Sequence, residues 1–431
     1  MKVTLLDVKG APNVSKDVAG GFGTRFKAGD SFRARLIERA KKGIRYPQLS
    51  LAYMAAVFKN GGHEVEYLEN KVPTDADVVI MPSSIVDFRT EIKYADEIRK
   101  STKAKVGFIR PFASLRPELY KDHCDFIIKG EPETVAVEIS KGNFPQGLVD
   151  SKPIPDQDSI PFPNWDPFPV ETYSYKPSLN KTPFLPVLTA RGCVFSCGYC
   201  PYPVGWAWRK PRTPENVIEE LKYLKEKYKI KAVMFRDPIF SRFKPRIQQL
   251  MDLMIKENLN LEWGCETRIA DLDEELLDKM RKAGLRSVEV GVESFYEHII
   301  KDENRIPVSI QTQEKIVKYC EKIGVKVSAF YVLGLLSDTK ETIEGTINYA
   351  KRLNTFAAQF NIYTPYPGTP DFERAKSKLM TEDWEKFDAY SVVFNHDNLT
   401  EEELLGYKEY ALTSYYFRPK WMLRHAINRF T

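Results

Sequence analysis

Short apolar runs alternate with helical patterns over the first third of the chain. The runs have the length of buried strands, and apolar positions at helical spacing fall between them. Strands that alternate with helices predict a parallel sheet with helices on its faces. We therefore expect an α/β, doubly wound, Rossmann-like domain over residues 1–148. Its strands are expected at residues 3–6, 64–68, 78–81, 105–109 and 126–129, and its helices within 31–41, 51–58 and 90–100.

The same alternation returns after a proline-rich stretch. Prolines crowd residues 149–184, which excludes helix and central strand and predicts an extended linker. From residue 185 six strand–helix units follow, so residues 185–395 are expected to form a partial (β/α)6 barrel of the TIM type rather than a closed eight-stranded one. The aromatic-rich segment 396–431 is expected to form a C-terminal helical tail.

Composition and charge narrow the functional classes. The chain has 431 residues, of which 43% are hydrophobic and 29% charged, and its net charge is +5. These values are ordinary for a globular protein, and the scattered basic residues indicate no nucleic-acid partner. No run approaches about 20 apolar residues, so no membrane span or signal peptide is expected. We expect a cytoplasmic protein whose cysteines outside one cluster are buried and unpaired.

That cluster is the strongest chemical signal. Cys193, Cys197 and Cys200 have the spacing C-x3-C-x2-C and follow an apolar run that predicts a strand. Three close thiolates suit a soft metal or an iron–sulfur cluster. A fourth nearby ligand is lacking, and an open coordination position is typical of a site that does chemistry. The alternative is that the thiols are small buried apolar residues, or that they hold a structural metal in a non-catalytic protein.

The cysteine spacing, with Tyr199 before the third thiol, resembles the signature of radical S-adenosylmethionine (SAM) enzymes. Two further stretches are similar to strand-end motifs of that family: Gly291-Val292-Glu293-Ser294, and the run from Tyr363 to Thr369. The resemblance implies a 4Fe–4S cluster on Cys193, Cys197 and Cys200 that cleaves SAM to a 5′-deoxyadenosyl radical. The family's barrel has six strands, as expected here.

The chemistry of SAM then suggests roles for four residues. Arg268 could pair with its carboxylate, because arginine binds carboxylates bidentately. Glu293 could accept from its amino group or ribose with Ser294 assisting, and the backbone near Tyr199 could contact adenine. The alternative is that Arg268 and Glu293 pair with each other across the barrel mouth.

The first domain resembles the cobalamin-binding domain of one radical SAM subgroup. The likeness rests on residues 47–53, 61–65 and 130–133. It implies cobalamin across the carboxyl ends of the strands, in contact with loops that contain Ser83, Ser84, Gly107, Arg110, Gly130 and Glu131. There is no D-x-H-x-x-G stretch to supply a lower axial ligand. Arg110 stands where the subgroup has glycine, so it lies near cobalt, or the cofactor is bound unusually or lost, or Arg110 is a solvated surface charge.

Together these resemblances place the chain with the class B radical methylases. They imply a cobalamin-dependent radical SAM enzyme that transfers methyl to an unactivated carbon. The alternatives are oxidative cyclisation, coupling or rearrangement without methyl transfer, and radical sulfur insertion, for which a second cysteine cluster is lacking. The expected partners are a reductant such as flavodoxin or ferredoxin and a small-molecule or lipid-like substrate, with the enzyme acting as a monomer.

Overall fold

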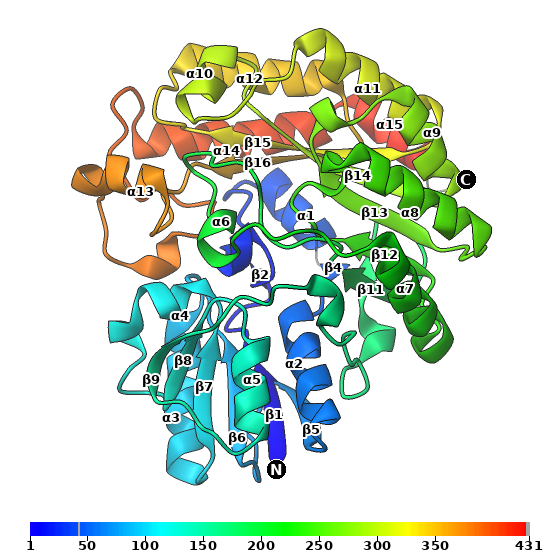
Figure 1. Cartoon of the computed structure of the whole chain (residues 1–431). Coiled ribbons are helices and arrows are strands. Elements are labelled where there is room, and N and C mark those ends of the chain that lie inside the picture. The colour runs from blue at the N-terminus through cyan, green and yellow to red at the C-terminus, as the bar shows by residue number, and fades with distance from the viewer. Residues whose placement is uncertain (42–43, 428–431) are drawn as a thin grey trace.

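The computed structural model describes residues 1–41 and 44–427. They form two α/β units, one above the other in Figure 1. The expected fold class is confirmed, because each unit is built on a six-stranded parallel sheet and two helices end the chain. Residues 428–431 of the expected tail lie outside the described residues.

The first sheet has the strand order β5-β1-β6-β7-β8-β9, with every neighbouring pair parallel. Its strands are β1 (Lys2–Asp7), β5 (Glu64–Glu69), β6 (Val78–Pro82), β7 (Lys105–Ile109), β8 (Phe126–Lys129) and β9 (Gly147–Asp150). The five strands expected from sequence are present. The sixth, β9, was missed because it is a short edge strand whose residues are mostly exposed.

Helices cover both faces of this sheet, as a buried central strand requires. Every residue of β6 is buried. One core packs the sheet against α2 and α5, and a second packs its other face against α3. The helices are α1 (Phe32–Lys41), α2 (Leu49–Asn60), α3 (Phe88–Ser101), α4 (Pro111–Leu115) and α5 (Glu133–Ser140). Sequence had not predicted α4 or α5.

The second sheet runs in chain order from β11 to β16, all parallel, and its first and last strands do not pair. Its strands are β11 (Phe184–Val187), β12 (Ala232–Phe235), β13 (Glu262–Thr267), β14 (Leu285–Glu293), β15 (Lys326–Leu333) and β16 (Ala357–Ile362). The helices are α6 (Tyr202–Gly205), α7 (Pro214–Tyr228), α8 (Lys244–Lys256), α9 (Glu274–Lys282), α10 (Glu297–Asp302), α11 (Ile310–Lys322), α12 (Lys340–Leu353) and α13 (Pro370–Ala375). This is a partial (β/α)6 barrel.

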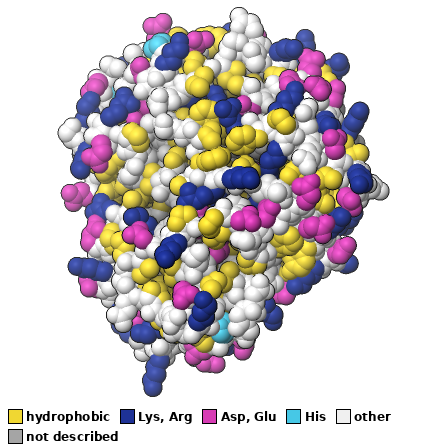
Figure 2. Space-filling model, in the orientation of Figure 1, with side chains coloured by type: hydrophobic (Ala, Val, Ile, Leu, Met, Phe, Trp, Pro, Cys, Tyr) yellow, Lys and Arg dark blue, Asp and Glu magenta, His cyan; other side chains and the backbone are white. Residues whose placement is uncertain are grey.

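The tail helices α14 (Glu401–Tyr416) and α15 (Pro419–Ile427) pack against the barrel, beside β15 and β16 in Figure 1. The Tyr415 hydroxyl donates to the backbone oxygen of Thr355 at 2.6 Å, and the Tyr416 hydroxyl donates to that of Ala358 at 2.7 Å. The aromatic residues that stood out in the sequence of the tail therefore include core residues. Among the described residues, no helix has both the length and the apolar character to span a bilayer. On the face in Figure 2, side chains of both charges are interspersed.

A segment between β1 and α1 lies across the carboxyl ends of the first sheet. We call residues 9–29 the strap. It contains the short strands β2 (Val14–Ser15) and β3 (Thr24–Arg25), which pair with each other. A second two-stranded ribbon, β4 (Ile44–Arg45) with β10 (Ser174–Tyr175), joins the region after α1 to the linker.

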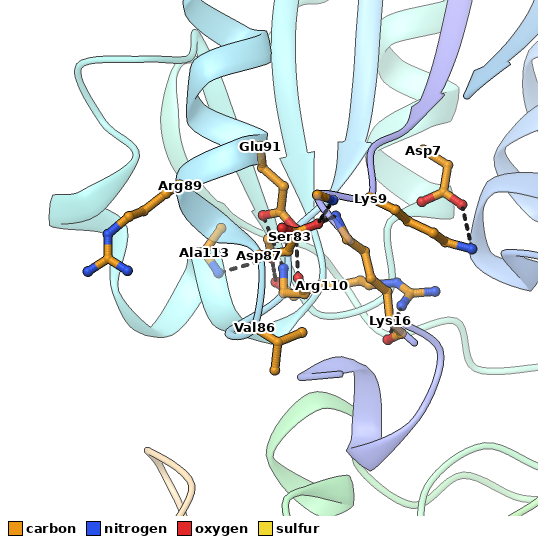
Figure 3. A network of polar contacts seen from close by, with 12 residues as sticks. Asp7, Lys9, Lys16, Ser83, Val86, Asp87, Arg89, Glu91, Arg110 and Ala113 are labelled. Atoms are coloured by element: carbon orange, nitrogen blue, oxygen red, sulfur yellow. Dashed lines mark hydrogen bonds and ion pairs between the residues drawn. The ribbon is translucent and has the colours of Figure 1, made fainter. Parts of the chain in front are cut away.

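The strap is held by a buried lysine. The Lys16 side chain is wholly buried, and its Nζ lies 2.6 Å from Glu91 Oε1 and 3.7 Å from Asp87 Oδ2. Glu91 also accepts hydrogen bonds from Ser84 and from the Tyr120 hydroxyl. Figure 3 shows Lys16 pointing from the strap toward the first turn of α3. Burial makes this pair costly to break, because the partner left behind keeps its charge in a dry site.

We expect Lys16→Met to destabilise the first domain by about 3–5 kcal/mol, since it leaves Glu91 buried without its cation. Lys141→Met is the matched control, because Lys141 pairs with Glu138 at a similar 2.7 Å but on the surface, where screening leaves little net effect. Denaturant unfolding followed by tryptophan and far-UV signals measures both. Equal midpoints for the two variants would contradict the prediction.

Candidate functional site

The three predicted cluster ligands lie on one loop after β11. Cys193, Cys197 and Cys200 are each partly exposed. The loop passes close to the backbone of the segment around Trp208: a Cβ on Gly192 would lie 2.3 Å from the Trp208 nitrogen. Gly192 also has a φ of +77°. Only glycine meets both conditions without strain. The structure thus places the three thiols together at the carboxyl edge of the barrel.

Burial and one arginine set the electrostatics of these thiols. Burial raises the pKa of Cys200 to about 12. Burial also raises the pKa of Cys197, and the Arg305 guanidinium opposes that rise. Among the described residues, no three His, Cys, Asp or Glu side chains converge to hold a single metal ion. In a four-iron cluster each thiolate binds a different iron, so the ligands stand farther apart, and three cysteines are its usual donors. The donor set fits such a cluster.

A buried ion pair faces the cysteine loop. Glu293 ends β14 with a φ of +65°, a strained conformation of the kind that clusters at functional sites. Its Oε1 lies 3.3 Å from Arg305 Nη2, and burial raises the pKa of Glu293. Arg305 also donates to the Tyr199 hydroxyl at 3.3 Å and to the backbone oxygen of Gly291 at 3.0 Å. A carboxylate and a bidentate cation side by side complement the zwitterionic end of an amino acid.

Arg268 occupies a different part of the barrel mouth. Its guanidinium carbon lies 4.4 Å from the ring centroid of Phe195, and its Nη2 donates to the backbone oxygen of Ile306 at 3.3 Å. The alternative that Arg268 pairs with Glu293 is wrong, because the partner of Glu293 is Arg305. The role of Arg268 toward SAM stays a prediction.

Sequence reasoning missed Arg305. The residue lies in the loop between α10 and α11. This loop does not directly follow a strand, whereas the predicted site residues do. The only feature of the sequence that could have indicated it is that Arg305 is a cation a few residues after the Gly291–Ser294 motif. Ser294 is buried and shares a hydrogen bond with the Thr346 hydroxyl at 3.2 Å, so its side chain contacts α12.

Arg110, one of the predicted cobalamin contacts, is buried at the end of β7 and has a φ of +85°. Its guanidinium donates to the Lys16 backbone oxygen at 2.8 Å, to Asp17 Oδ1 at 2.6 Å, to Gln48 Oε1 at 2.7 Å and to Ser50 Oγ at 2.9 Å. The interpretation of Arg110 as a solvated surface charge is therefore wrong. Its hydrogen bonds hold the strap, which Figure 3 shows beside it.

Ser83 and Ser84 lie at the same edge but face inward. The Ser83 hydroxyl donates to the backbone oxygen of Ile109 at 3.0 Å, and the Ser84 hydroxyl donates to Glu91 at 2.7 Å. Both side chains have partners within the domain. They therefore reinforce the loops that carry the strap.

The remaining predicted cobalamin contacts are dispersed. Gly107 is in the middle of β7, where a Cβ would lie 2.0 Å from the Phe126 ring, so close packing accounts for this glycine. Gly130 has a φ of +87° in the turn after β8. Glu131 lies 3.1 Å from Arg209 and so joins the first domain to the barrel. The roles of these three residues toward cobalamin stay predictions.

The carboxyl edge of the first sheet has the position that a corrin requires, since it faces the cysteine loop. The strap covers that edge here. The Arg236 guanidinium of the barrel donates to the Asp17 backbone oxygen at 2.8 Å, and a Cβ on Gly20 would lie 2.8 Å from the Tyr202 Cα. The strap therefore occupies the edge at which the resemblance places the corrin.

Comparison with known proteins agrees with the barrel geometry. The sequence profile of the Radical SAM superfamily matches residues 187–350, which include the cysteine loop and Arg305.

Three curated relatives match most of the chain. An uncharacterized methyltransferase of Pyrococcus horikoshii is 29% identical over 89% of this chain and 90% of its own length. The anaerobic magnesium-protoporphyrin IX monomethyl ester cyclase of Rubrivivax gelatinosus is 27% identical over 84% of this chain and 72% of its own. Bacteriochlorophyllide d C-8(2)-methyltransferase of Chlorobaculum tepidum is 28% identical over 80% of this chain and 78% of its own length.

A solved structure shares the whole two-unit fold. It is the radical SAM methyltransferase TsrM of Kitasatospora setae, solved with cobalamin and a [4Fe-4S] cluster bound, which covers 87% of this chain and 78% of its own at a TM-score of 0.60 and 16% identity. That likeness shows the fold alone. Residues 187–350 of the chain are therefore similar to the Radical SAM superfamily, and the described chain has a two-unit fold similar to that of TsrM.

Proposed function

We propose that this chain is a cobalamin-dependent radical SAM enzyme that transfers a methyl group to an unactivated carbon. The observation that carries the proposal is the cysteine loop facing the Glu293–Arg305 pair at the barrel mouth. Two of the three relatives are named methyltransferases, one for a carbon position. Methyl transfer is therefore the reaction that the similarities favour.

The chain's own residues would bind and orient SAM. When bound to Cys193, Cys197 and Cys200, the cluster supplies the electron for reductive cleavage of SAM. Arg305 would take the SAM carboxylate, and Glu293 would take its ammonium group, because the two side chains already lie 3.3 Å apart. Their burial keeps water from screening these contacts.

The first domain would hold the second cofactor. When bound, cobalamin supplies a methyl group for transfer. The strap would leave the carboxyl edge to admit it, which breaks the contacts of Lys16 with Glu91 and of Asp17 with Arg110. The edge that this uncovers faces the barrel mouth, so substrate would lie between the two domains.

The Rubrivivax relative, named a cyclase, favours oxidative cyclisation as a second candidate function. Both reactions begin with the same cleavage of SAM. Their products differ, because S-adenosylhomocysteine accompanies 5′-deoxyadenosine only when methyl is transferred.

We further propose a cytoplasmic enzyme that works as a monomer and is reduced by a flavodoxin or ferredoxin. The six cysteines are free in the structure, which suits a reducing compartment. The substrate would be a small or lipid-like molecule.

We expect the triple variant Cys193→Ala, Cys197→Ala, Cys200→Ala to lose 5′-deoxyadenosine formation, because no donors remain for the cluster. Cys320→Ala is the control, since that thiol is buried far along the chain at α11. Anaerobic reconstitution, iron and sulfide analysis and product chromatography give the readout. Undiminished deoxyadenosine, or a colourless zinc protein from anaerobic purification, would exclude the proposed chemistry.

We expect Arg305→Ala to weaken SAM binding about 10- to 100-fold, which corresponds to losing a charge-assisted hydrogen bond worth about 1.5–3 kcal/mol. Arg305→Lys should lie between, because lysine lacks the bidentate fork. Arg286→Ala, at the opposite end of β14, is the matched control. Equilibrium binding of SAM to the reconstituted enzyme measures all three, and wild-type affinity in Arg305→Ala would refute the assignment.

A further inference from the structure

Three consecutive residues grip the cysteine loop from behind. We call Glu303, Asn304 and Arg305 the clasp. The Glu303 backbone oxygen accepts from the Gly198 nitrogen at 2.9 Å. Asn304 Nδ2 donates to the backbone oxygen and the hydroxyl of Ser196, both at 3.0 Å. With Arg305 beside Cys197 and Tyr199, the clasp contacts the loop on both sides of its second thiol.

A second segment holds the same glycine from another side. The Asp371 nitrogen, in the first turn of α13, donates to the Gly198 oxygen at 3.1 Å. A Cβ on Gly198 would lie 2.4 Å from Asp371 Oδ1. Both peptide groups of Gly198, which lies between Cys197 and Cys200, are therefore fixed by segments far apart in the sequence.

The side chains of these two segments meet in a buried carboxyl pair. Glu303 is 1% and Asp371 0% exposed. Arg374 Nη1 lies 2.8 Å from Asp371 Oδ1 and 3.5 Å from Glu303 Oε2. Glu303 Oε1 and Asp371 Oδ2 are buried and accept no hydrogen bond of normal geometry from the described residues, although the Tyr363 hydroxyl lies near Asp371. A single proton between the two carboxyl groups would satisfy both oxygens.

Physical chemistry also requires that proton. Two carboxylates this close in a dry site cannot both be ionised. Burial, together with the hydrogen bond and charge of Asp371, raises the pKa of Glu303 to about 9. Arg374 contacts Asp371 more closely than Glu303, so Glu303 is the carboxyl group that keeps the proton at neutral pH.

We propose that Glu303 and Asp371 are positioning residues whose shared proton locks together the two segments that hold Gly198, and so fixes Cys197 and Cys200 for cluster binding. The inference rests on the proposed function, because the loop is taken as the cluster's binding site. Neither residue touches the thiols. Both act through Gly198.

The test compares variants that keep or remove the shared hydrogen bond. Glu303→Gln still donates to Asp371, whereas Glu303→Ala cannot. Glu297→Ala, exposed in the first turn of the helix α10 that precedes Glu303, is the matched control. After anaerobic reconstitution we expect about tenfold faster cluster loss to a chelator in Glu303→Ala and in Asp371→Ala, and near wild-type retention in Glu303→Gln. The double alanine variant should be no worse than either single one, because the pair acts as a unit.

A pH series provides a readout that simple packing would not change. The charged and titratable groups around Glu303 are Asp302, Asp371, Arg374 and Tyr363. Because the folded pKa of Glu303 is raised, its stabilising hydrogen bond is present at low pH and is lost as the pH rises through about 9. As the pH rises through about 9, cluster retention should therefore fall more steeply in the wild type than in Glu303→Gln. The glutamine side chain does not titrate.

Three results would overturn the inference: wild-type cluster retention in Glu303→Ala, equal losses in Glu303→Gln and Glu303→Ala, or identical pH profiles for wild type and Glu303→Gln. Thermal unfolding of the cluster-free variants identifies any general damage to the fold. Cluster retention needs no substrate and no turnover. An enzyme that holds its cluster as expected and yet fails to form deoxyadenosine would count against the proposed function. It would not count against the positioning role of Glu303 and Asp371.

Discussion

Buried arginines hold the two domains together, and the site depends on the alignment they impose. Arg110 from the first sheet and Arg236 from the barrel both donate to Asp17 of the strap, one to its side chain and one to its backbone. Arg191, next to the cysteine loop, donates to Glu133 at 2.6 Å. Arg191 and Arg236 reach across the domain boundary, to Glu133 and to the Asp17 backbone oxygen, whereas the partners of Arg110 lie in its own domain. Removing a partner leaves a buried charge, so the relative position of the two carboxyl edges is strongly constrained.

Much of the fold was predictable because buried strands and helices have a characteristic local spacing of apolar residues in the sequence. The four inner strands of the first sheet and the six barrel strands are largely apolar runs of strand length. Helix starts carry their own signals: the Thr213 side chain, just before a proline, accepts from the Asn216 nitrogen at 3.2 Å. The strand β9 and the helix α5 escaped, because one is exposed and the other follows a proline in a loop. Short edge elements leave little pattern to read.

The strap and the clasp were not predictable for a different reason. Lys16 is a lysine in a glycine-rich, basic stretch, which in sequence is typical of a solvated loop, and yet it is wholly buried. Arg305 and Arg268 are equally plausible carboxylate ligands on paper. Their surroundings differ, because Arg305 contacts Tyr199 of the cysteine loop and Glu293, whereas Arg268 lies over the Phe195 ring. Partners that meet only through tertiary structure leave no periodic trace in the sequence.

The strap links the first sheet to the barrel in one set of contacts. It lies between the edge where a corrin would bind and the barrel mouth, and it uses the same residue, Asp17, to reach both. A movement that uncovers the first edge must also release Arg236, which is ion-paired with Glu266 at the carboxyl end of the barrel. Access to the first domain and the charge distribution at the barrel mouth therefore cannot change independently. Within the described residues the clasp has no hydrogen-bond partner in common with the strap, so the contacts that hold the cysteine loop are independent of those that hold the strap.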